Sequence, residues 1–207
     1  MIPSDGARIA AIVLAAGAST RMGTPKPLLR LRGETLLARA VRAVRAGGCA
    51  FVVVVVPGEP SSASGESATL SEARSSGALV VANPGWSEGV ASSIRAGLAA
   101  VEGDPSILGV LVLAVDQPFV EPEDVARLIS GSQGAEAIAA ADHGNGIAGI
   151  PALFPRRCFP ALGRLRGDSG ARGIIESEKA ARRVPMPSAA IDVDSPEDCQ
   201  RRGIDAG

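Results

Sequence analysis

The residues with the clearest chemical potential lie in segment 14–27, where glycines, hydroxyl side chains, an arginine and a lysine follow an apolar run. Small residues let backbone N–H groups come close to an anion, and Arg21 and Lys26 add positive charge where the amides cannot. The planar guanidinium of Arg21 can grip two phosphate oxygens, whereas Lys26 is a mobile point charge suited to the phosphates that leave. This composition predicts a triphosphate-binding loop, with a plain surface turn as the alternative.

The same segment excludes two common classes of nucleotide-binding protein. Gly17 and Gly23 are not followed by Lys-Ser or Lys-Thr, as a P-loop requires, and no Gly-x-Gly-x-x-Gly follows the first expected strand. The chain is therefore neither a P-loop ATPase nor an ordinary dinucleotide oxidoreductase.

A second candidate is Asp116, which comes directly after the apolar residues 107–115 and is soon followed by a proline. In open α/β sheets, ligands bind beyond the carboxyl ends of the strands. A carboxylate fixed there is a suitable Mg²⁺ ligand, because Mg²⁺ prefers hard oxygen donors. A helix-capping role is the alternative, but Glu121 and Pro122 already provide the start of the next helix. We therefore expect Asp116 to bind Mg²⁺.

Segment 14–26, Leu-Ala-Ala-Gly-Ala-Ser-Thr-Arg-Met-Gly-Thr-Pro-Lys, resembles the signature Leu-Ala-(Ala/Gly)-Gly-x-Ser-x-Arg-Met-Gly-x-x-Lys of the molybdenum-cofactor nucleotidyltransferases. These enzymes are part of the larger group that makes nucleoside-diphosphate sugars. Ala16 makes the segment more similar to the cytidylyltransferase branch than to the guanylyltransferase branch. The resemblance implies a nucleotide-binding role for Leu14, Ala15, Ala16, Gly17 and Ser19. Together with the chemistry above, it makes Arg21, Lys26 and Asp116 the expected catalytic residues.

The next polar cluster follows the strand expected at 78–82, where helix N-termini also point toward a ligand. Asn83, Ser92 and Ser93 are therefore candidates for contacting the base or the ribose. In the resembled family, a similar Asn-Pro…Gly-x-x-x-Ser segment lies against the nucleoside. This favours Asn83 and one of the two serines, without deciding which.

The acceptor side is expected later in the chain. Residues 143–154 indicate a flexible connection and a short strand that could close over an acceptor, but Gly149-Ile150-Pro151 stands where the resembled family often carries Gly-His-Pro. This departure leaves the acceptor open. Segment 165–172 resembles the family's Leu-x-Gly-Asp-x-Gly-Ala-Arg, which implies that Asp168 and Arg172 hold an anionic acceptor at a helix N-terminus. Capping of that helix is the alternative for Asp168.

The resemblance also implies a second metal ligand, in the final segment 189–198. Its Ser-Pro-Glu is a good helix start, so Asp194 and Ser195 are partly explained structurally. Asp192, expected on a strand, lacks such an explanation. Its counterpart three residues before the Ser/Thr-Pro of related enzymes is the second metal-binding position. We therefore expect Mg²⁺ on Asp116 and Asp192.

Several other conspicuous residues are expected to have structural roles. Ser87 is placed to cap the helix that follows it, and Trp86 to pack. His143 is the only histidine and lies among glycines with no nucleophile motif nearby, so it is expected to be a loop residue. The cysteines lack metal-ligand spacing and are expected to be reduced thiols that fill space: Cys49, Cys158 and Cys199.

The amino-acid composition limits the classes of function that the chain can have. The chain has 207 residues, 46% of them hydrophobic, and a net charge of −1, which suits one sizeable core and is too balanced for a nucleic-acid binder. Aromatic residues make up only 2%, and no apolar run approaches the ~20 residues needed to span a membrane. The first residues do not form a secretory signal, so a cytoplasmic location is expected.

The elements that must position these residues alternate between strands and helices. Apolar runs predict strands at 9–14, 51–56, 78–82, 107–115 and 135–141. Helical spacing predicts helices at 35–46, 68–75, 122–129 and 171–177, with another ending at residue 100. We expect one three-layer Rossmann-like α/β domain over 1–207, with a mostly parallel sheet of the nucleotide-diphospho-sugar transferase type. Residues 8–120 would bind the nucleotide and residues 121–207 the acceptor.

The expected function is Mg²⁺-dependent transfer of a cytidylyl group from CTP to the phosphate of a molybdopterin-type cofactor, with release of pyrophosphate. A molybdoenzyme or its chaperone is the candidate recipient of the product. The alternatives are transfer to another small phosphate, including a sugar phosphate, guanylylation from GTP, and a nucleotide-binding regulator without catalysis. The sequence does not determine the oligomeric state.

Overall fold

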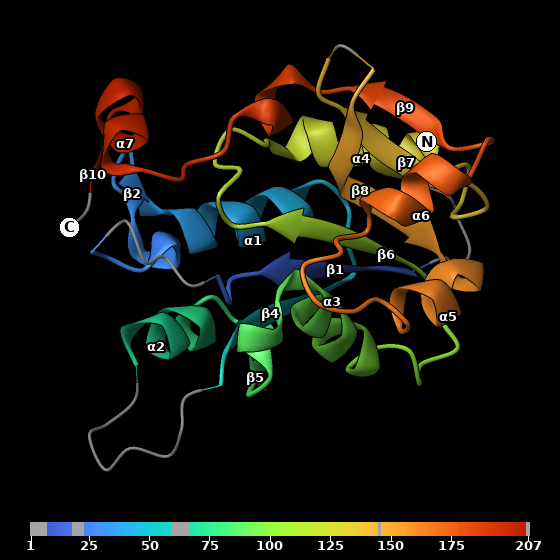
Figure 1. Cartoon of the computed structure of the whole chain (residues 1–207), viewed down its shortest axis with the longest axis horizontal. Coiled ribbons are helices and arrows are strands. Elements are labelled where there is room, and N and C mark those ends of the chain that lie inside the picture. The colour runs from blue at the N-terminus through green and yellow to red at the C-terminus, as the bar shows by residue number, and fades with distance from the viewer. Residues whose placement is uncertain (1–7, 18–22, 59–66, 145, 206–207) are drawn as a thin grey trace.

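The central feature of the computed structural model is a seven-stranded sheet in the order β5-β4-β1-β6-β8-β7-β9 (Figure 1). The structure describes residues 8–17, 23–58, 67–144 and 146–205. The strands of this sheet are β1 (Arg8–Leu14), β4 (Phe51–Pro57), β5 (Leu79–Asn83), β6 (Ile107–Ala114), β7 (Ala139–Asp142), β8 (Ala148–Pro155) and β9 (Arg182–Pro185). The α-helices are α1 (Leu36–Ala46), α2 (Ala68–Ser75), α3 (Val90–Ala99), α4 (Pro122–Gly131), α5 (Phe159–Leu162), α6 (Arg172–Ser177) and α7 (Pro196–Arg202).

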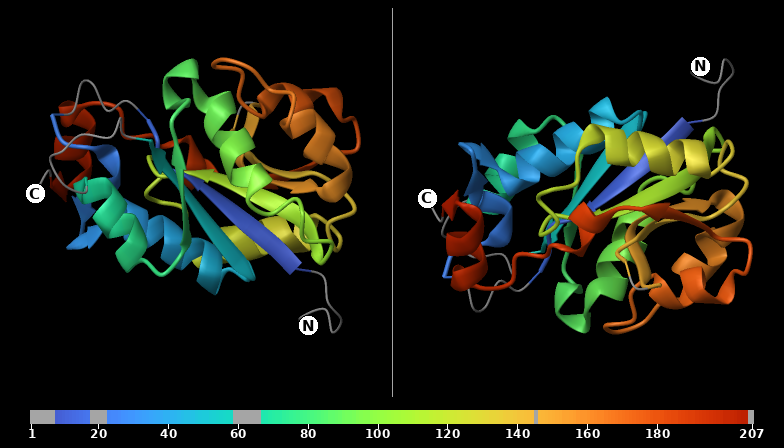
Figure 2. Two further views of the ribbon diagram at one scale, coloured as in Figure 1. Left: turned by 90° about the horizontal axis from the view of Figure 1, so that it is seen from below. Right: turned by 90° about the horizontal axis from the view of Figure 1, so that it is seen from above.

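Helices cover both faces of the sheet, which makes three layers (Figure 2). The side chains of β1 alternate between two buried clusters, with Ala11 and Val13 in the cluster that includes α1, α2 and α4. Ala10, Ile12 and Leu14 join the cluster that includes α3, α5 and α6. Because neither face of the central strands meets water, they are almost continuously apolar. The prediction of a three-layer α/β domain with a mostly parallel sheet is confirmed.

The sheet brings one end of most strands to a single edge. Strands β5, β4, β1 and β6 run parallel to one another, whereas β8 is antiparallel to both β6 and β7. Strand β9 is parallel to β7. The carboxyl ends of β6, β7 and β9 therefore lie at the same edge as the start of β8, and the segments that follow these strands meet there.

A small second sheet ties the last described residues to the region of Lys26. Its antiparallel strands are β2 (Arg30–Leu31), β3 (Glu34–Thr35) and β10 (Ile204–Asp205), with β2 in the middle. A short 3₁₀ helix, η1 (Lys26–Leu28), precedes it. Since α7 leads directly into β10, the chain from residue 191 onward returns to the start of the fold, where α7 lies beside β2 (Figure 1).

Most predicted elements are confirmed to within a few residues, and three local expectations are wrong. Ser87 does not cap α3, because it lies in the 3₁₀ helix η2 (Trp86–Glu88) and the N-cap is Gly89, with no side-chain bond. The strand expected from 135 starts at Ala139, because the chain first makes a tight turn with positive φ at Gln133 and Ala135. Asp192 is not on a strand.

Asp192 follows the 3₁₀ helix η4 (Pro187–Ala190) in irregular backbone. Its place is fixed by its neighbour, since Val193 N donates a 3.0 Å hydrogen bond to the carbonyl of Asp116. The segment therefore joins the end of β6 by one backbone bond without extending the sheet. In the part of the chain that the structure describes, no helix is long and apolar enough to cross a lipid bilayer.

Candidate active site

Lys26 lies between two carboxylates at the carboxyl edge of the sheet. Its Nζ is 3.1 Å from Asp116 Oδ2 and 2.5 Å from Asp194 Oδ1. The lysine side chain is 15% exposed, against 28% for Asp116 and 63% for Asp194, so the ammonium is the most enclosed of the three groups. The contact joins the start of the fold, the end of β6 and the returning C-terminal segment.

The charge state of Lys26 depends on these partners. Burial alone would lower its pKa, but the negative charges and hydrogen bonds of Asp116 and Asp194 outweigh burial, so the pKa is raised. Lys26 therefore carries a positive charge throughout the neutral range.

Asp192 adds a third acidic side chain to this region. Burial is the main reason that its pKa is raised to about 6, and the negative charges of Asp116 and Asp194 raise it further. His143 and Lys26 act in the opposite direction. The predicted pair Asp116 and Asp192 is thus brought together, at a place where like charges are crowded.

The acidic pair of Asp116 and Asp192 fits a divalent metal ion. Asp116 and Asp192 offer hard oxygen donors, and a cation would relieve the repulsion that contributes to the raised pKa of Asp192. Among the described residues, no group of three or more His, Cys, Asp or Glu side chains forms a metal cage. Mg²⁺ commonly takes one or two carboxylates and completes its shell with phosphate oxygens and water.

Gln117, the residue after Asp116, connects this cluster to two other segments. It is 6% exposed, and its Nε2 donates 2.9 Å hydrogen bonds to the carbonyls of Ile150 and Ala189. The first carbonyl belongs to β8, and the second precedes Asp192. One amide group therefore fixes the end of β6 relative to both.

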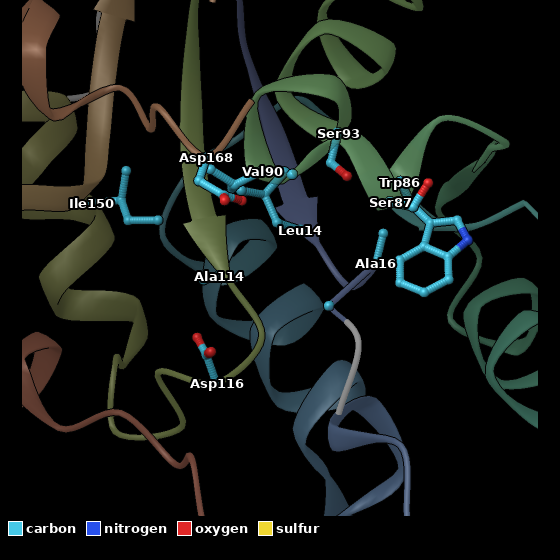
Figure 3. Close-up of a pocket in the computed structure, with 12 residues that line it drawn as sticks. Leu14, Ala16, Trp86, Ser87, Val90, Ser93, Ala114, Asp116, Ile150 and Asp168 are labelled. Atoms are coloured by element: carbon cyan, nitrogen blue, oxygen red, sulfur yellow. The ribbon is translucent and has the colours of Figure 1, made fainter. Parts of the chain in front are cut away.

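A cavity of about 330 Å³ opens beside Asp116 (Figure 3). Ala16 and Trp86 lie together at one end of it and Ile150 at the other, while the carboxylate of Asp116 lies apart from both. Four of the residues predicted to bind nucleotide line this cavity: Leu14, Ala16, Gly17 and Ser93. Ser87, expected to be a cap, lines it too.

The other predicted nucleotide-binding residues support this cavity from behind or lie elsewhere. Asn83 is buried, and its Nδ2 donates to the hydroxyls of Ser92 at 2.8 Å and Ser93 at 3.1 Å. Ser92 in turn donates to the carbonyl of Gly89, which leaves Ser93 as the serine that lines the cavity. Ala15 faces the opposite core and donates its N–H to the carbonyl of Val55 at 2.8 Å. Ser19 and Arg21 lie outside the described residues.

A second cavity, of about 320 Å³, meets the first at Asp116. The two share Val90, Ala114, Asp116 and Ile150 as lining residues. Polar side chains from several separate segments reach the second cavity: Gln117, His143, Arg172 and Asp192. The arrangement provides two adjacent binding spaces with one carboxylate common to both.

The two residues predicted to bind the acceptor are divided between the cavities. Arg172 lines the second cavity, with its side chain 61% exposed and 2.7 Å from Glu176. Asp168 lines the first, next to the nucleotide-binding residues. The capping alternative for Asp168 is wrong, because the N-cap of α6 is Ala171 and no side chain caps that helix.

The loop that carries Asp168 is held against the start of α3. Gly89 has a φ of +119°, and a Cβ there would lie 2.5 Å from the carbonyl oxygen of Gly167, so only glycine fits. Arg95 donates to the carbonyl of Leu165 at 2.7 Å and pairs with Glu88 at 2.6 Å. Glu88 also accepts from the backbone N–H of Gly167 at 3.1 Å.

Sequence reasoning gave no binding role to Ser87, which lines the first cavity, or to four further residues of the site. His143 and Gln117 line the second cavity, Trp86 lines the first, and Asp194 holds Lys26. The position of Gln117 immediately after Asp116 was an available signal. The others depend on contacts between segments far apart in the chain. The cysteines agree with expectation: all are free and buried, and burial raises the pKa of each thiol.

Comparisons with known proteins agree with this architecture. Residues 11–183 match the family described as "MobA-like NTP transferase domain". The nicotine blue oxidoreductase of Paenarthrobacter nicotinovorans is 35% identical over 177 residues, covering 82% of each chain. The probable molybdenum cofactor guanylyltransferase of Opitutus terrae is 33% identical over 193 residues, covering 89% of this chain and 87% of that protein.

A solved structure gives the same picture. Rv0371c from Mycobacterium tuberculosis H37Rv has a TM-score of 0.76 at 30% identity, covering 95% of this chain and 98% of that chain. A complex of Rv0371c with manganese has a TM-score of 0.71 at 28% identity, covering 94% and 97%. With its carboxylates, its lysine and its paired cavities, the chain is a nucleotidyltransferase that belongs to the MobA-like NTP transferase family.

Proposed function

We propose that the protein transfers a cytidylyl group from CTP to the phosphate of a molybdopterin-type cofactor, with Mg²⁺, and releases pyrophosphate. The observation that carries this proposal is the meeting of two cavities at Asp116, with Lys26 3.1 Å from that carboxylate. A donor in the first cavity and an acceptor in the second would bring their phosphates together there. Residues 8–120 supply most of the first cavity, and residues 121–207 supply much of the second.

The reaction requires that the two substrates be positioned and that their negative charge be neutralised. A phosphate monoester has a second pKa near ~6, so it is already a strong anion at neutral pH and needs no general base to become a nucleophile. The site must hold two polyanions in line and neutralise the charge that builds on the α-phosphate and on the leaving pyrophosphate.

Lys26 is the described residue best placed for this task, because its ammonium stays charged and contacts Asp116, the carboxylate that both cavities share. Asp116 and Asp192 would hold Mg²⁺, which supplies further positive charge to the phosphates when bound. Arg21 is the second proposed phosphate ligand. We assign Asp168 to the nucleotide side and Arg172 to the acceptor side, since they line the first and the second cavity respectively.

The choice of CTP rests on Ala16. Its methyl group lies at the Trp86 end of the first cavity (Figure 3) and would take room that a two-ring guanine needs. Because the Opitutus relative is named as a guanylyltransferase, GTP is the main alternative to CTP as the nucleotide substrate. The proposal includes a cytoplasmic location, where CTP is present. It also includes a molybdoenzyme or its chaperone as the protein that receives the product.

Pyrophosphate release tests the proposal. The protein would be incubated with Mg²⁺, with CTP or GTP, and with molybdopterin, sugar phosphates or no acceptor. Release that requires CTP and molybdopterin together is expected. Tight CTP binding without turnover on any acceptor would favour a regulator. Failure to bind either nucleotide would favour a redox activity like that named for the Paenarthrobacter relative.

A further inference from the structure

His143 occupies a fixed position at the tip of the β7–β8 hairpin. Its backbone N–H donates to the carbonyl of Ile147 at 2.9 Å, and the N–H of Gly144 donates to Asp142 Oδ1 at 2.9 Å. Arg183, on β9, holds the carbonyl of Gly146 at 2.6 Å. The hairpin therefore presents His143 at the carboxyl edge of the sheet, where it lines the second cavity.

The imidazole ring is oriented by two features of β8. Its Nε2 lies 2.9 Å from the carbonyl oxygen of Ile150, and because a carbonyl only accepts, Nε2 carries the hydrogen. The ring lies over Gly149, where a Cβ would be 2.9 Å from Cε1 of the ring. Glycine at 149 thus makes room for the ring, and Ile150 sets its tautomer.

This tautomer leaves Nδ1 of the neutral ring as a hydrogen-bond acceptor. Nδ1 makes no hydrogen bond with any residue that the structure describes. Most other side chains that line the cavity are apolar: Val90, Ile94, Ala114, Ile150 and Ala171. A bound molecule would therefore find few side-chain hydrogen-bond acceptors there. The two carboxylates there, Asp116 and Asp192, are already assigned to the metal.

We propose that His143 is an acceptor-binding residue, whose Nδ1 receives a hydrogen bond from an N–H or O–H group of the acceptor substrate. This inference rests on the proposed function, and it narrows the acceptor to a phosphate monoester that carries a hydrogen-bond donor within reach of its phosphate. The contact orients the body of the acceptor while its phosphate lies at Asp116.

The imidazole ring could instead have a purely structural role, in which it only supports the carbonyl of Ile150. The two roles predict that different substitutions of His143 keep activity, so kinetics can separate them. The amide of asparagine reaches the position of Nδ1, whereas the amide of glutamine reaches the position of Nε2. If Nδ1 binds substrate, His143→Asn keeps much of the activity and His143→Gln loses it. If the ring only supports the carbonyl of Ile150, glutamine is the better replacement.

The first experiment measures kcat and KM for molybdopterin and for CTP in these variants. We expect His143→Gln and His143→Ala to lower kcat/KM for molybdopterin by about 2- to 13-fold, the range for one net hydrogen bond, and to leave the KM for CTP unchanged. Ile147→Ala is the matched control, because Ile147 is an exposed side chain on the same hairpin and outside both cavities.

Gly149→Ala provides an independent test of the ring position. The added methyl would push the ring away, so it should reduce kcat/KM for molybdopterin in the wild-type background and cause little further loss in the His143→Ala background. Additive losses would mean that the methyl acts without the ring and would count against the inference.

Because the chain has one histidine, ¹⁵N NMR of histidine-labelled protein gives a readout that does not need turnover. We expect the Nε2–H tautomer in the free protein and a shift of the Nδ1 signal when molybdopterin is added, but not when CTP and Mg²⁺ are added. An unshifted Nδ1 with bound molybdopterin, or normal kinetics in His143→Gln, would overturn the inference and leave the proposed function intact. Wild-type protein with no turnover on any acceptor would instead overturn the proposed function.

Discussion

The two cavities are built in different ways, although they share one carboxylate. The first is formed largely by consecutive residues around the ends of β1 and η2, where small side chains such as Ala16 and Gly17 leave the backbone exposed to a ligand. The second is formed by short pieces of several segments far apart in the sequence, and its polar side chains Gln117, His143 and Arg172 come from three of them. A local sequence motif can encode the first kind of site. Only the complete fold creates the second.

The carboxylate common to both cavities should give the largest effect. Asp116→Asn removes one negative charge without changing volume, so we expect turnover to be abolished while the protein remains folded. Turnover in saturating Mg²⁺ and the melting temperature would be measured on the same preparation. Near-normal turnover would show that the two cavities do not depend on this group.

Lys26 comes next, because it joins the shared carboxylate of Asp116 to Asp194 in the returning C-terminal segment. Lys26→Ala should lower kcat by a factor of ~10²–10³ if the ammonium stabilises charge that develops in the transition state. Steady-state kinetics with CTP would check this. An effect confined to KM would mean that Lys26 only helps to bind the nucleotide.

Ala16 tests whether the first cavity selects the base by shape. Steric discrimination of this size is worth ~1–3 kcal/mol, so Ala16→Gly should raise the efficiency with GTP relative to CTP by about 10- to 200-fold, without making GTP preferred. The comparison needs kcat/KM for both nucleotides in both proteins. A wild type that uses GTP as well as CTP, or a ratio that does not move, would remove the main support for CTP.

The smallest effect concerns the loop that carries Asp168. The pKa of Glu88 is lowered to about 2, first by its hydrogen bond from Arg95 and then by that from the N–H of Gly167. A lowered pKa in the folded state means that this contact stabilises the protein above the ordinary carboxyl pKa of 4.5, and that the stabilisation disappears as pH falls toward 2. Glu88→Gln should therefore reduce stability at neutral pH slightly, with the difference from wild type vanishing in acid. Denaturant unfolding at several pH values would measure it, and a difference that persists in acid would contradict the assignment.

Most of the fold was predictable because its signals are local. The apolar run of β4 and the helical spacing of α1 each report burial directly, and Thr35 caps α1 through a hydrogen bond that its position suggests. The small sheet of β2, β3 and β10 was not predicted, since strands of two residues have no periodicity to detect.

The site was predictable only where one segment carries it. Leu14, Ala16 and Gly17 line the first cavity as expected, and Asp116 follows its strand as expected. His143 could not be assigned, because its role depends on the pairing of β7 with β8 and on the carbonyl of Ile150. Arg172 was placed on the acceptor side by the resemblance alone.

The return of the C-terminal segment has a consequence for how the protein matures during synthesis. Lys26 and Asp194 are 168 positions apart, so the ammonium can meet its second carboxylate only after residues 26–194 have all been synthesised. The first strands can pair earlier, which would give a nascent chain with a formed core and an incomplete catalytic centre. Each doubling of loop length adds only about 0.6 kcal/mol to the entropic cost of closure, so the length of the loop between these two residues costs little stability. Synthesis of the segment that carries Asp194 is therefore the step that completes the contacts of Lys26.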